Sequence, residues 1–92
     1  MSENQRMRAH VSGHVQGVGF RYFTLMTGQR LQLTGWVRNL ADGGVETLAE
    51  GPKEDLISFL EALWEGPGGA HVRDVRTQWL PATGEFTGFR IW

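Results

Sequence analysis

A glycine-rich stretch near the start of the chain, SGHVQGVGFRYF at residues 12–23, has the composition of an anion-binding loop. Where such a loop leads into a helix, successive backbone N–H groups point inward and the helix dipole adds positive potential. Arg21 follows Gly17 and Gly19 closely and offers a planar guanidinium that can bind a phosphate through two hydrogen bonds. The glycine spacing fits neither G-x-x-x-x-G-K-[ST] nor G-x-G-x-x-G, which excludes the common nucleotide-binding motifs. The alternative is a tight strand-to-helix turn beside a solvated Arg21.

The groups that usually carry catalysis are poorly placed elsewhere in the chain. There is no cysteine, which excludes disulfides, thiolate metal sites and a cysteine nucleophile. His10 and His14 are four residues apart on a predicted strand, so their Cα atoms are about 13 Å apart and cannot share a metal ion. The same spacing keeps Glu46 and Glu50 from forming an acid–base pair. The usual nucleophiles, acid–base pairs and metal ligands are therefore missing, which leaves the glycine-rich loop as the candidate site, one that would position an anion.

The composition is that of a small folded domain, with 40% apolar and 21% charged residues. We expect one domain over residues 1–92, a flexible tail at residues 1–5, no membrane-spanning segment and a cytoplasmic location. Residues 1–40 carry five arginines and one glutamate (+4), and residues 41–92 carry four basic and nine acidic groups (−5), which sum to −1. This balance argues against general nucleic-acid binding. The four tryptophans are expected to serve in packing, with Trp36 alone near the loop.

The pattern of apolar residues predicts the element order βαββαβ, followed by a short terminal strand. The predicted strands are residues 7–15, 33–40, 45–50, 72–80 and 86–92; the predicted helices are residues 20–31 and a segment between Gly51-Pro52 and Gly66-Pro67, with a loop after it to residue 71. This order is typical of an α+β ferredoxin-like sandwich, an antiparallel sheet covered on one face by two helices. With the first and third elements as central strands, Asn39 would lie near the mouth of the loop. Taken alone, Asn39 is a common residue beside a turn.

Two motifs together resemble those of the acylphosphatase family, which are small ferredoxin-like hydrolases. VSGHVQGVGFR at residues 11–21 is similar to the family's loop signature, and GWVRNLADGGVETLAEG at residues 35–51 is similar to its second signature. With the ending FRIW, the likeness spans nearly the whole chain. It departs at Gly28, which costs a helix about 1 kcal/mol relative to alanine. It also departs at Gln32, where a helix-ending glycine would be expected.

The resemblance implies an enzyme that hydrolyses acyl phosphates to a carboxylate and inorganic phosphate. It assigns phosphate binding to Arg21 and orientation of the attacking water to Asn39. Backbone N–H groups of the loop would complete the phosphate site; they belong to His14, Val15, Gln16, Gly17, Val18, Gly19 and Phe20. The resemblance further implies a monomer that takes a small-molecule substrate, needs no metal or cofactor and is inhibited by its phosphate product.

Two other hypotheses remain open at this point. The first is a non-catalytic ferredoxin-like module that holds a phosphorylated ligand or RNA, because similar domains occur inside larger proteins that handle carbamoyl phosphate. The single predicted domain and the presence of Asn39 with Arg21 argue against it. The second concerns regulation. Since the chain ends in a predicted strand, the Trp92 carboxylate could pair with Arg21 in the empty enzyme.

Overall fold

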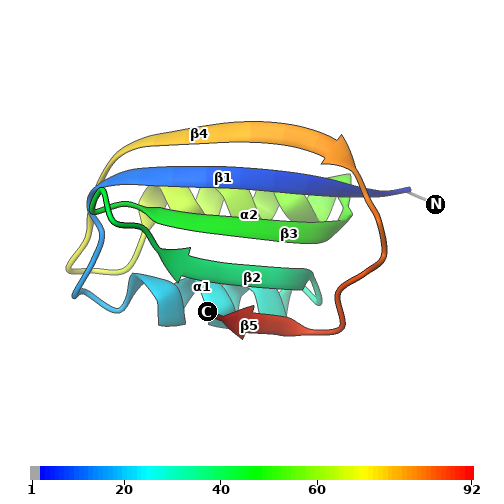
Figure 1. Cartoon of the computed structure of the whole chain (residues 1–92), viewed down its shortest axis with the longest axis horizontal. Coiled ribbons are helices and arrows are strands. Elements are labelled where there is room, and N and C mark those ends of the chain that lie inside the picture. The colour runs from blue at the N-terminus through cyan, green and yellow to red at the C-terminus, as the bar shows by residue number, and fades with distance from the viewer. Residues whose placement is uncertain (1–2) are drawn as a thin grey trace.

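A computed structural model describes residues 3–92, which form five strands and two helices (Figure 1). The strands are β1 (Asn4–His14), β2 (Thr34–Asn39), β3 (Val45–Pro52), β4 (His71–Pro81) and β5 (Phe89–Ile91). The helices are α1 (Phe20–Arg30) and α2 (Lys53–Glu65). The order confirms the predicted βαββαβ arrangement with a short terminal strand. Within residues 3–92, neither helix is long and apolar enough to cross a membrane.

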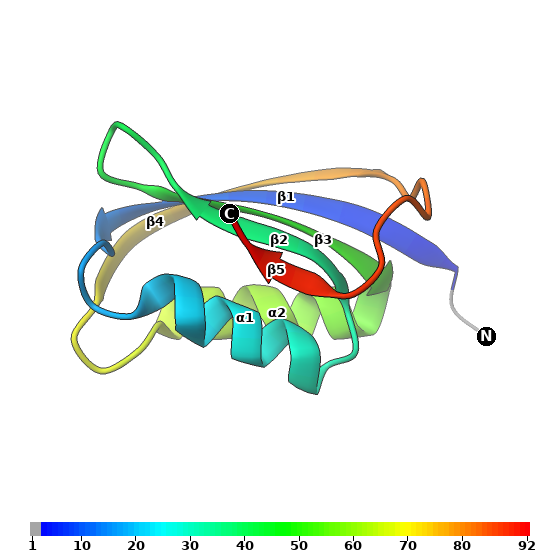
Figure 2. The same ribbon diagram turned by 60° about the horizontal axis from the view of Figure 1, so that its bottom comes forward.

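The strands form one sheet in the order β4-β1-β3-β2-β5, and both helices cover the same face of it (Figure 2). The four long strands pair antiparallel, whereas β5 joins the edge of β2 in parallel, so the sheet is mixed. This architecture confirms the ferredoxin-like α+β fold. The prediction that the first and third elements are the central strands was wrong, because β3 lies between β1 and β2 and pairs with both.

The core lies between the sheet and the two helices, and it follows from the alternation of side chains along the central strands. Met7, Ala9 and Val11 of β1 are fully buried, as are Val45 and Ala49 of β3. The helices contribute Phe20, Leu56, Phe59 and Leu63 to the same cluster. Burial of a large apolar side chain stabilises the fold by about 1.5–3 kcal/mol. This layer therefore fixes the start of α1 relative to the end of β1.

The residue in left-handed conformation that follows the C-cap of helix α1 is not glycine. Gln32 has a φ of 58°, the one positive φ among the non-glycine residues within 3–92. The N–H of Leu33 donates to the Gly28 carbonyl at 2.9 Å. The N–H of Gln32 donates to the Gln29 carbonyl at 3.0 Å, which completes a Schellman motif. The glycine expected here thus reflects a backbone requirement, which Gln32 meets at a cost of about 1 kcal/mol.

Gly28 is buried where β5 packs against α1. A Cβ atom at this position would lie 2.6 Å from the ring of Phe89, closer than any real contact of this kind. The residue that lowers the helix propensity of α1 therefore permits the close approach of β5. This approach matters for the site described below, because Ile91 at the end of β5 lines it.

The start of β1 differs from the prediction. Asn4 and Gln5, predicted to lie in a flexible tail, belong to the strand, and Gln5 pairs with Gly51 on one side and Pro81 on the other. Backbone pairing on both sides orders this segment. The rest of the predicted tail includes residues 1 and 2, which lie outside the described residues.

Three later boundaries also differ from the prediction. Pro52 ends β3 and serves as the N-cap of α2, instead of occupying its first helical position. His71, predicted to lie in a loop, is the first residue of β4 and pairs with His14. The terminal strand begins only at Phe89.

Candidate active site

Residues 15–19 connect β1 to α1 through two left-handed glycines. Gly17 has a φ of 74° and Gly19 a φ of 78°. A Cβ atom at either position would have no heavy atom outside its immediate chain neighbours within 4 Å, so the backbone dihedral, and not lack of space, requires glycine. Val15 and Phe20, at the two ends of this segment, are buried in the core. The fold thus anchors the loop at both ends.

The backbone N–H groups of residues 16–22 take part in no hydrogen bond within residues 3–92. Gly19 is the N-cap of α1, no side chain caps the helix, and its first turn holds no acidic residue. Helix α2, in contrast, carries Glu54 and Asp55 in its first turn. The positive end of the α1 dipole is therefore not neutralised by a side chain, which suits the binding of an anion.

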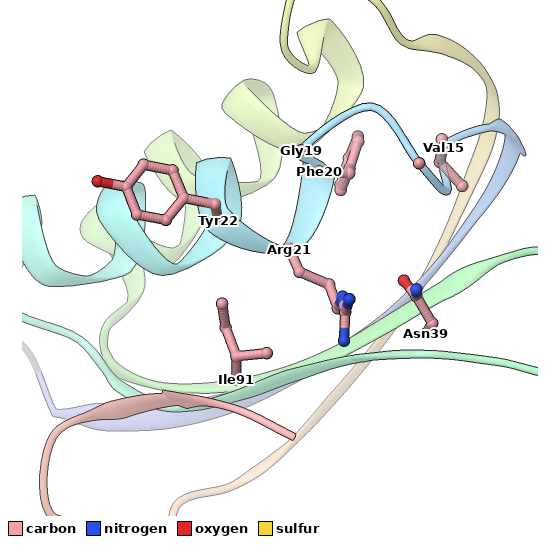
Figure 3. Close-up of a pocket in the computed structure, with 8 residues that line it drawn as sticks. Val15, Gly19, Phe20, Arg21, Tyr22, Asn39 and Ile91 are labelled. Atoms are coloured by element: carbon pink, nitrogen blue, oxygen red, sulfur yellow. The ribbon is translucent and has the colours of Figure 1, made fainter.

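Arg21 and Asn39 meet at a pocket of about 240 Å³ between the loop, the start of α1, the end of β2 and β5. Figure 3 shows the two side chains pointing toward one another in this pocket. Neither side chain makes a hydrogen bond or an ion pair with another residue in the described range 3–92. The guanidinium and the amide are therefore both available to a ligand. The volume lies just below the range of about 300–1,000 Å³ that is typical of pockets for drug-sized ligands.

Asn39 reaches the pocket because of its position on β2. Side chains alternate between the two faces of a strand, and Val37, two residues earlier, is fully buried beneath the helices. Arg38, between them, lies on the opposite face and pairs with Glu46 at 2.6 Å. Asn39 is the last residue of the strand, at the end of the sheet where α1 begins. Its amide therefore lies on the helix side, next to the loop (Figure 3).

The pocket brings together six of the nine predicted site residues: Val15, Gly17, Gly19, Phe20, Arg21 and Asn39. The other three lie around it. His14 ends β1, and its ring centroid is 6.4 Å from that of His71. The Gln16 side chain reaches the turn between β2 and β3, and Val18 packs against the core.

Tyr22 and Ile91 also line the pocket, although the motifs gave no role to either. Tyr22 is 62% exposed, and Figure 3 shows its ring directed away from Arg21. Its place at the pocket follows from its position next to Arg21 in the first turn of α1. Ile91 could not be found in this way, because only the parallel pairing of β5 with β2 brings it there.

The two glutamates of β3 lie on the helix-free face of the sheet and form ion pairs. Glu50 pairs with Arg6 at 2.6 Å, and Glu46 pairs with Arg8 at 2.7 Å and with Arg38 at 2.6 Å. Burial raises the pKa of each carboxyl, but the hydrogen bonds that each accepts outweigh burial, so both pKa values lie below the usual range. These carboxylates hold the sheet together and are remote from the pocket.

Trp36, expected to lie near the loop, is not part of the pocket. It lies on the helix-free face, where its ring stacks on that of Trp92 with centroids 4.5 Å apart. The N–H of Trp92 donates to the Val37 carbonyl at 2.8 Å, and within residues 3–92 no ion pair joins its carboxylate to Arg21. In the same part of the chain, no three histidines or acidic residues converge as a metal-ion site.

Comparison with known proteins gives one consistent family. The acylphosphatase family model matches residues 7–91. An acylphosphatase from Salinibacter ruber is 49% identical over 87 residues, which cover 95% of this chain and 92% of that relative. The crystal structure of acylphosphatase from Bacillus subtilis aligns with a TM-score of 0.93 and 42% identity, over 96% of this chain and 98% of that one.

A larger protein contains a similar unit. The crystal structure of full-length HypF in its phosphate- and nucleotide-bound form aligns with a TM-score of 0.87 and 25% identity. The likeness covers all of this chain but only 12% of HypF, so it concerns one unit of that protein. The family model and the relatives of similar length agree with the motifs that meet at the pocket. The chain therefore belongs to the acylphosphatase family.

Proposed function

We propose that the pocket is the catalytic site for hydrolysis of an acyl phosphate. Arg21 and the backbone N–H groups of residues 16–22 hold the phosphoryl group, and Asn39 orients the attacking water. One observation carries this proposal: an arginine and an asparagine without partners in residues 3–92 converge on a pocket at an uncapped helix N-terminus. Membership of the acylphosphatase family supports the substrate class.

The reaction transfers a phosphoryl group from a carboxylate to water. The water oxygen attacks phosphorus in line with the leaving oxygen, the bond between phosphorus and the acyl oxygen breaks, and the carboxylate leaves with the electron pair. One water proton stays on the incoming oxygen and the other passes to a phosphoryl oxygen, which gives inorganic phosphate. A carboxylic acid has a pKa of about 4, so the carboxylate leaves without prior protonation. No general acid is needed, and among residues 3–92 no Asp, Glu or His lines the pocket.

Catalysis in this scheme rests on fixed charge and position. The Arg21 guanidinium and the loop N–H groups donate hydrogen bonds to the phosphoryl oxygens, whose charge they stabilise in the transition state. The Asn39 side-chain oxygen accepts a hydrogen bond from the water and directs its lone pair at phosphorus. The acyl group can then contact Ile91, an apolar residue that lines the pocket from β5.

Hydrolysis of benzoyl phosphate, followed by the loss of its ultraviolet absorbance, tests the proposed reaction. We expect turnover that inorganic phosphate inhibits competitively and that EDTA leaves unchanged, because the proposed chemistry needs no metal. A rate equal to that of the buffer alone would refute the proposal. So would a rate that EDTA abolishes and a divalent cation restores.

A second function, a non-catalytic module that holds a phosphorylated ligand or RNA, draws support from the likeness to one unit of HypF. It predicts phosphate or RNA binding, with a salt-sensitive shift for RNA, and no turnover of benzoyl phosphate. We favour the enzyme because the B. subtilis relative matches over nearly its whole length. The proposal includes a monomeric, cytoplasmic protein, and sedimentation at the assay concentration tests the monomer.

A further inference from the structure

The side chain of Gln16 links the loop to the turn between β2 and β3. Its amide nitrogen donates to the Leu40 carbonyl at 2.7 Å and to the Gly44 carbonyl at 2.8 Å. Both N–H bonds of the amide are thereby used. Within residues 3–92, these are the two side-chain hydrogen bonds that join loop residues 15–19 to another element.

The acceptors of these bonds place Gln16 next to the water-orienting residue of the proposed site. Leu40 follows Asn39 directly in the chain. The Gly44 carbonyl also accepts a hydrogen bond from the Leu40 N–H at 2.9 Å, which closes the turn. Gln16 thus binds both ends of the turn at residues 40–44, which follows Asn39 directly.

Few other contacts fix the turn relative to the loop. The pairing of β1 with β3 ends at Val11 and Val45, so residues 40–44 extend beyond it. His10 reaches the exposed side of this turn, where its ring lies 3.1 Å from Asp42. That contact ties the turn to β1 and not to the loop. The buried ends of the loop, Val15 and Phe20, belong to the common core, which includes no residue of the turn at residues 40–44.

We propose that Gln16 is a positioning residue, which holds Asn39 at the correct distance from a phosphate bound by the loop. This inference rests on the proposed function. The Gln16 side chain touches neither phosphate nor water in this scheme; it fixes one half of the site relative to the other, whereas the Gln16 backbone N–H belongs to the phosphate-binding loop. The loop and Arg21 can bind phosphate without it, but the water is directed at phosphorus only while both halves keep their relative position.

The main test replaces Gln16 with methionine, which has a similar length and no N–H donor. We expect Gln16→Met to lower kcat by about 10- to 100-fold, the usual cost of a small misplacement of a catalytic group. The inhibition constant of inorganic phosphate should change by less than about 3-fold, a small change in binding free energy. Gln29→Met is the matched control, because the Gln29 side chain is exposed and makes no hydrogen bond within residues 3–92. It should retain the wild-type kcat.

A double-mutant cycle with Asn39→Ala separates positioning from a general loss of structure. If Gln16 acts through Asn39, Gln16→Met should cost little further kcat once Asn39 is alanine. In the Arg21→Gln background, where Asn39 is intact, it should still cost most of its 10- to 100-fold. An equal further loss of kcat in the Asn39→Ala background would refute the positioning role.

Gln16→Glu provides a second variant with a pH readout. The ionised carboxylate cannot donate and faces two carbonyl oxygens, whereas the protonated form can donate one hydrogen bond. We expect the kcat of Gln16→Glu relative to wild type to rise as the pH falls through the pKa of the introduced carboxyl. A ratio that stays constant with pH would count against the proposal, and so would a Gln16→Met variant with wild-type kcat. Wild-type kcat in Asn39→Ala alone would instead refute the role of Asn39 in the proposed function, and this inference with it.

Discussion

The arginines on the helix-free face of the sheet differ from Arg21 in their partners. Arg6 pairs with Glu50 at 2.6 Å, and Glu46 is held between two further arginines, at 2.7 and 2.6 Å. Arg21, at the end of the sheet where α1 begins, has no such partner within residues 3–92, although it lies beside a pocket. Arginine side chains of this fold are therefore neutralised by glutamates on the helix-free face, whereas Arg21 at the pocket is not.

The difference follows from how much an unpaired charge would destabilise the fold at each position. The Glu50 side chain is only 3% exposed, and an unpaired carboxylate at this depth would be strongly destabilising. Its arginine therefore serves the stability of the sheet. Arg21 is exposed, so the fold loses little by leaving it unpaired. We expect a bound anionic ligand to supply the partner of Arg21. Arginines paired with glutamates thus stabilise the fold, whereas the unpaired Arg21 belongs to the site.

The largest expected effect comes from removing the unpaired arginine. Arg21→Gln should lower kcat/KM for benzoyl phosphate by at least about 1,000-fold, because a charged donor to the phosphoryl oxygens is lost. The free energy of unfolding should change by less than about 0.5 kcal/mol, as for other exposed residues without partners. Arg6→Gln should show the reverse, with lower stability and normal kcat. Near-normal activity of Arg21→Gln would contradict the claim that the unpaired arginine serves the reaction.

A second prediction concerns Glu50 on the helix-free face, whose contribution to stability depends on pH. Burial raises the pKa of Glu50, but the backbone N–H groups of Thr83 and Gly84 and the Arg6 guanidinium donate hydrogen bonds that outweigh burial and lower it. The folded protein thus binds this proton less readily than the unfolded chain. The stabilisation is complete above the unfolded pKa of about 4.5 and is lost as the pH falls through the lower folded pKa.

Replacement of Glu50 by glutamine should therefore cost about 2 kcal/mol of stability at pH 7, because it breaks a buried charged network. For a domain of this size, that corresponds to a decrease in Tm of about 10 °C. The Tm of Glu50→Gln should fall less steeply between pH 5 and pH 3 than that of wild type, as measured by circular dichroism. Parallel acid profiles for the two proteins would contradict the role given to this carboxylate.

The smallest effect is expected at the end of α1, which belongs to neither region. Gln32→Gly should stabilise the protein by about 0.5–1 kcal/mol, because glycine takes a positive φ without steric cost. The kcat should not change, since Gln32 is remote from the pocket. Urea denaturation measures the first effect and the benzoyl phosphate assay the second. A loss of stability would show that the side chain of Gln32 contributes more than its backbone strain costs.

Local patterns predicted the fold well, because the alternation of apolar residues along each strand decides which of its faces is buried. The two halves of the candidate site, Arg21 and Asn39, were predicted from the resemblance of two motifs to the acylphosphatase signatures, and the structure brings both to one pocket. Their roles in catalysis remain predictions.

Features that depend on long-range packing could not be predicted. Ile91 lines the pocket because β5 pairs in parallel with β2, and β5 comes close because Gly28 leaves room for Phe89. The direction of the Gln16 side chain depends on a turn 24 residues later in the chain. Trp36 was misplaced because alternation places it on the face opposite to Asn39, although the two lie on one strand.

Titration of the nitrogen-15-labelled protein with inorganic phosphate tests the central claim most directly. NMR reports each backbone N–H separately, so it shows which region of the molecule binds the anion. We predict that the shifts concentrate on the N–H groups of residues 16–22 and the Nε–H of Arg21, and that Arg21→Gln abolishes them. Shifts centred instead on the arginines of the helix-free face, or none in the loop at saturating phosphate, would contradict the account.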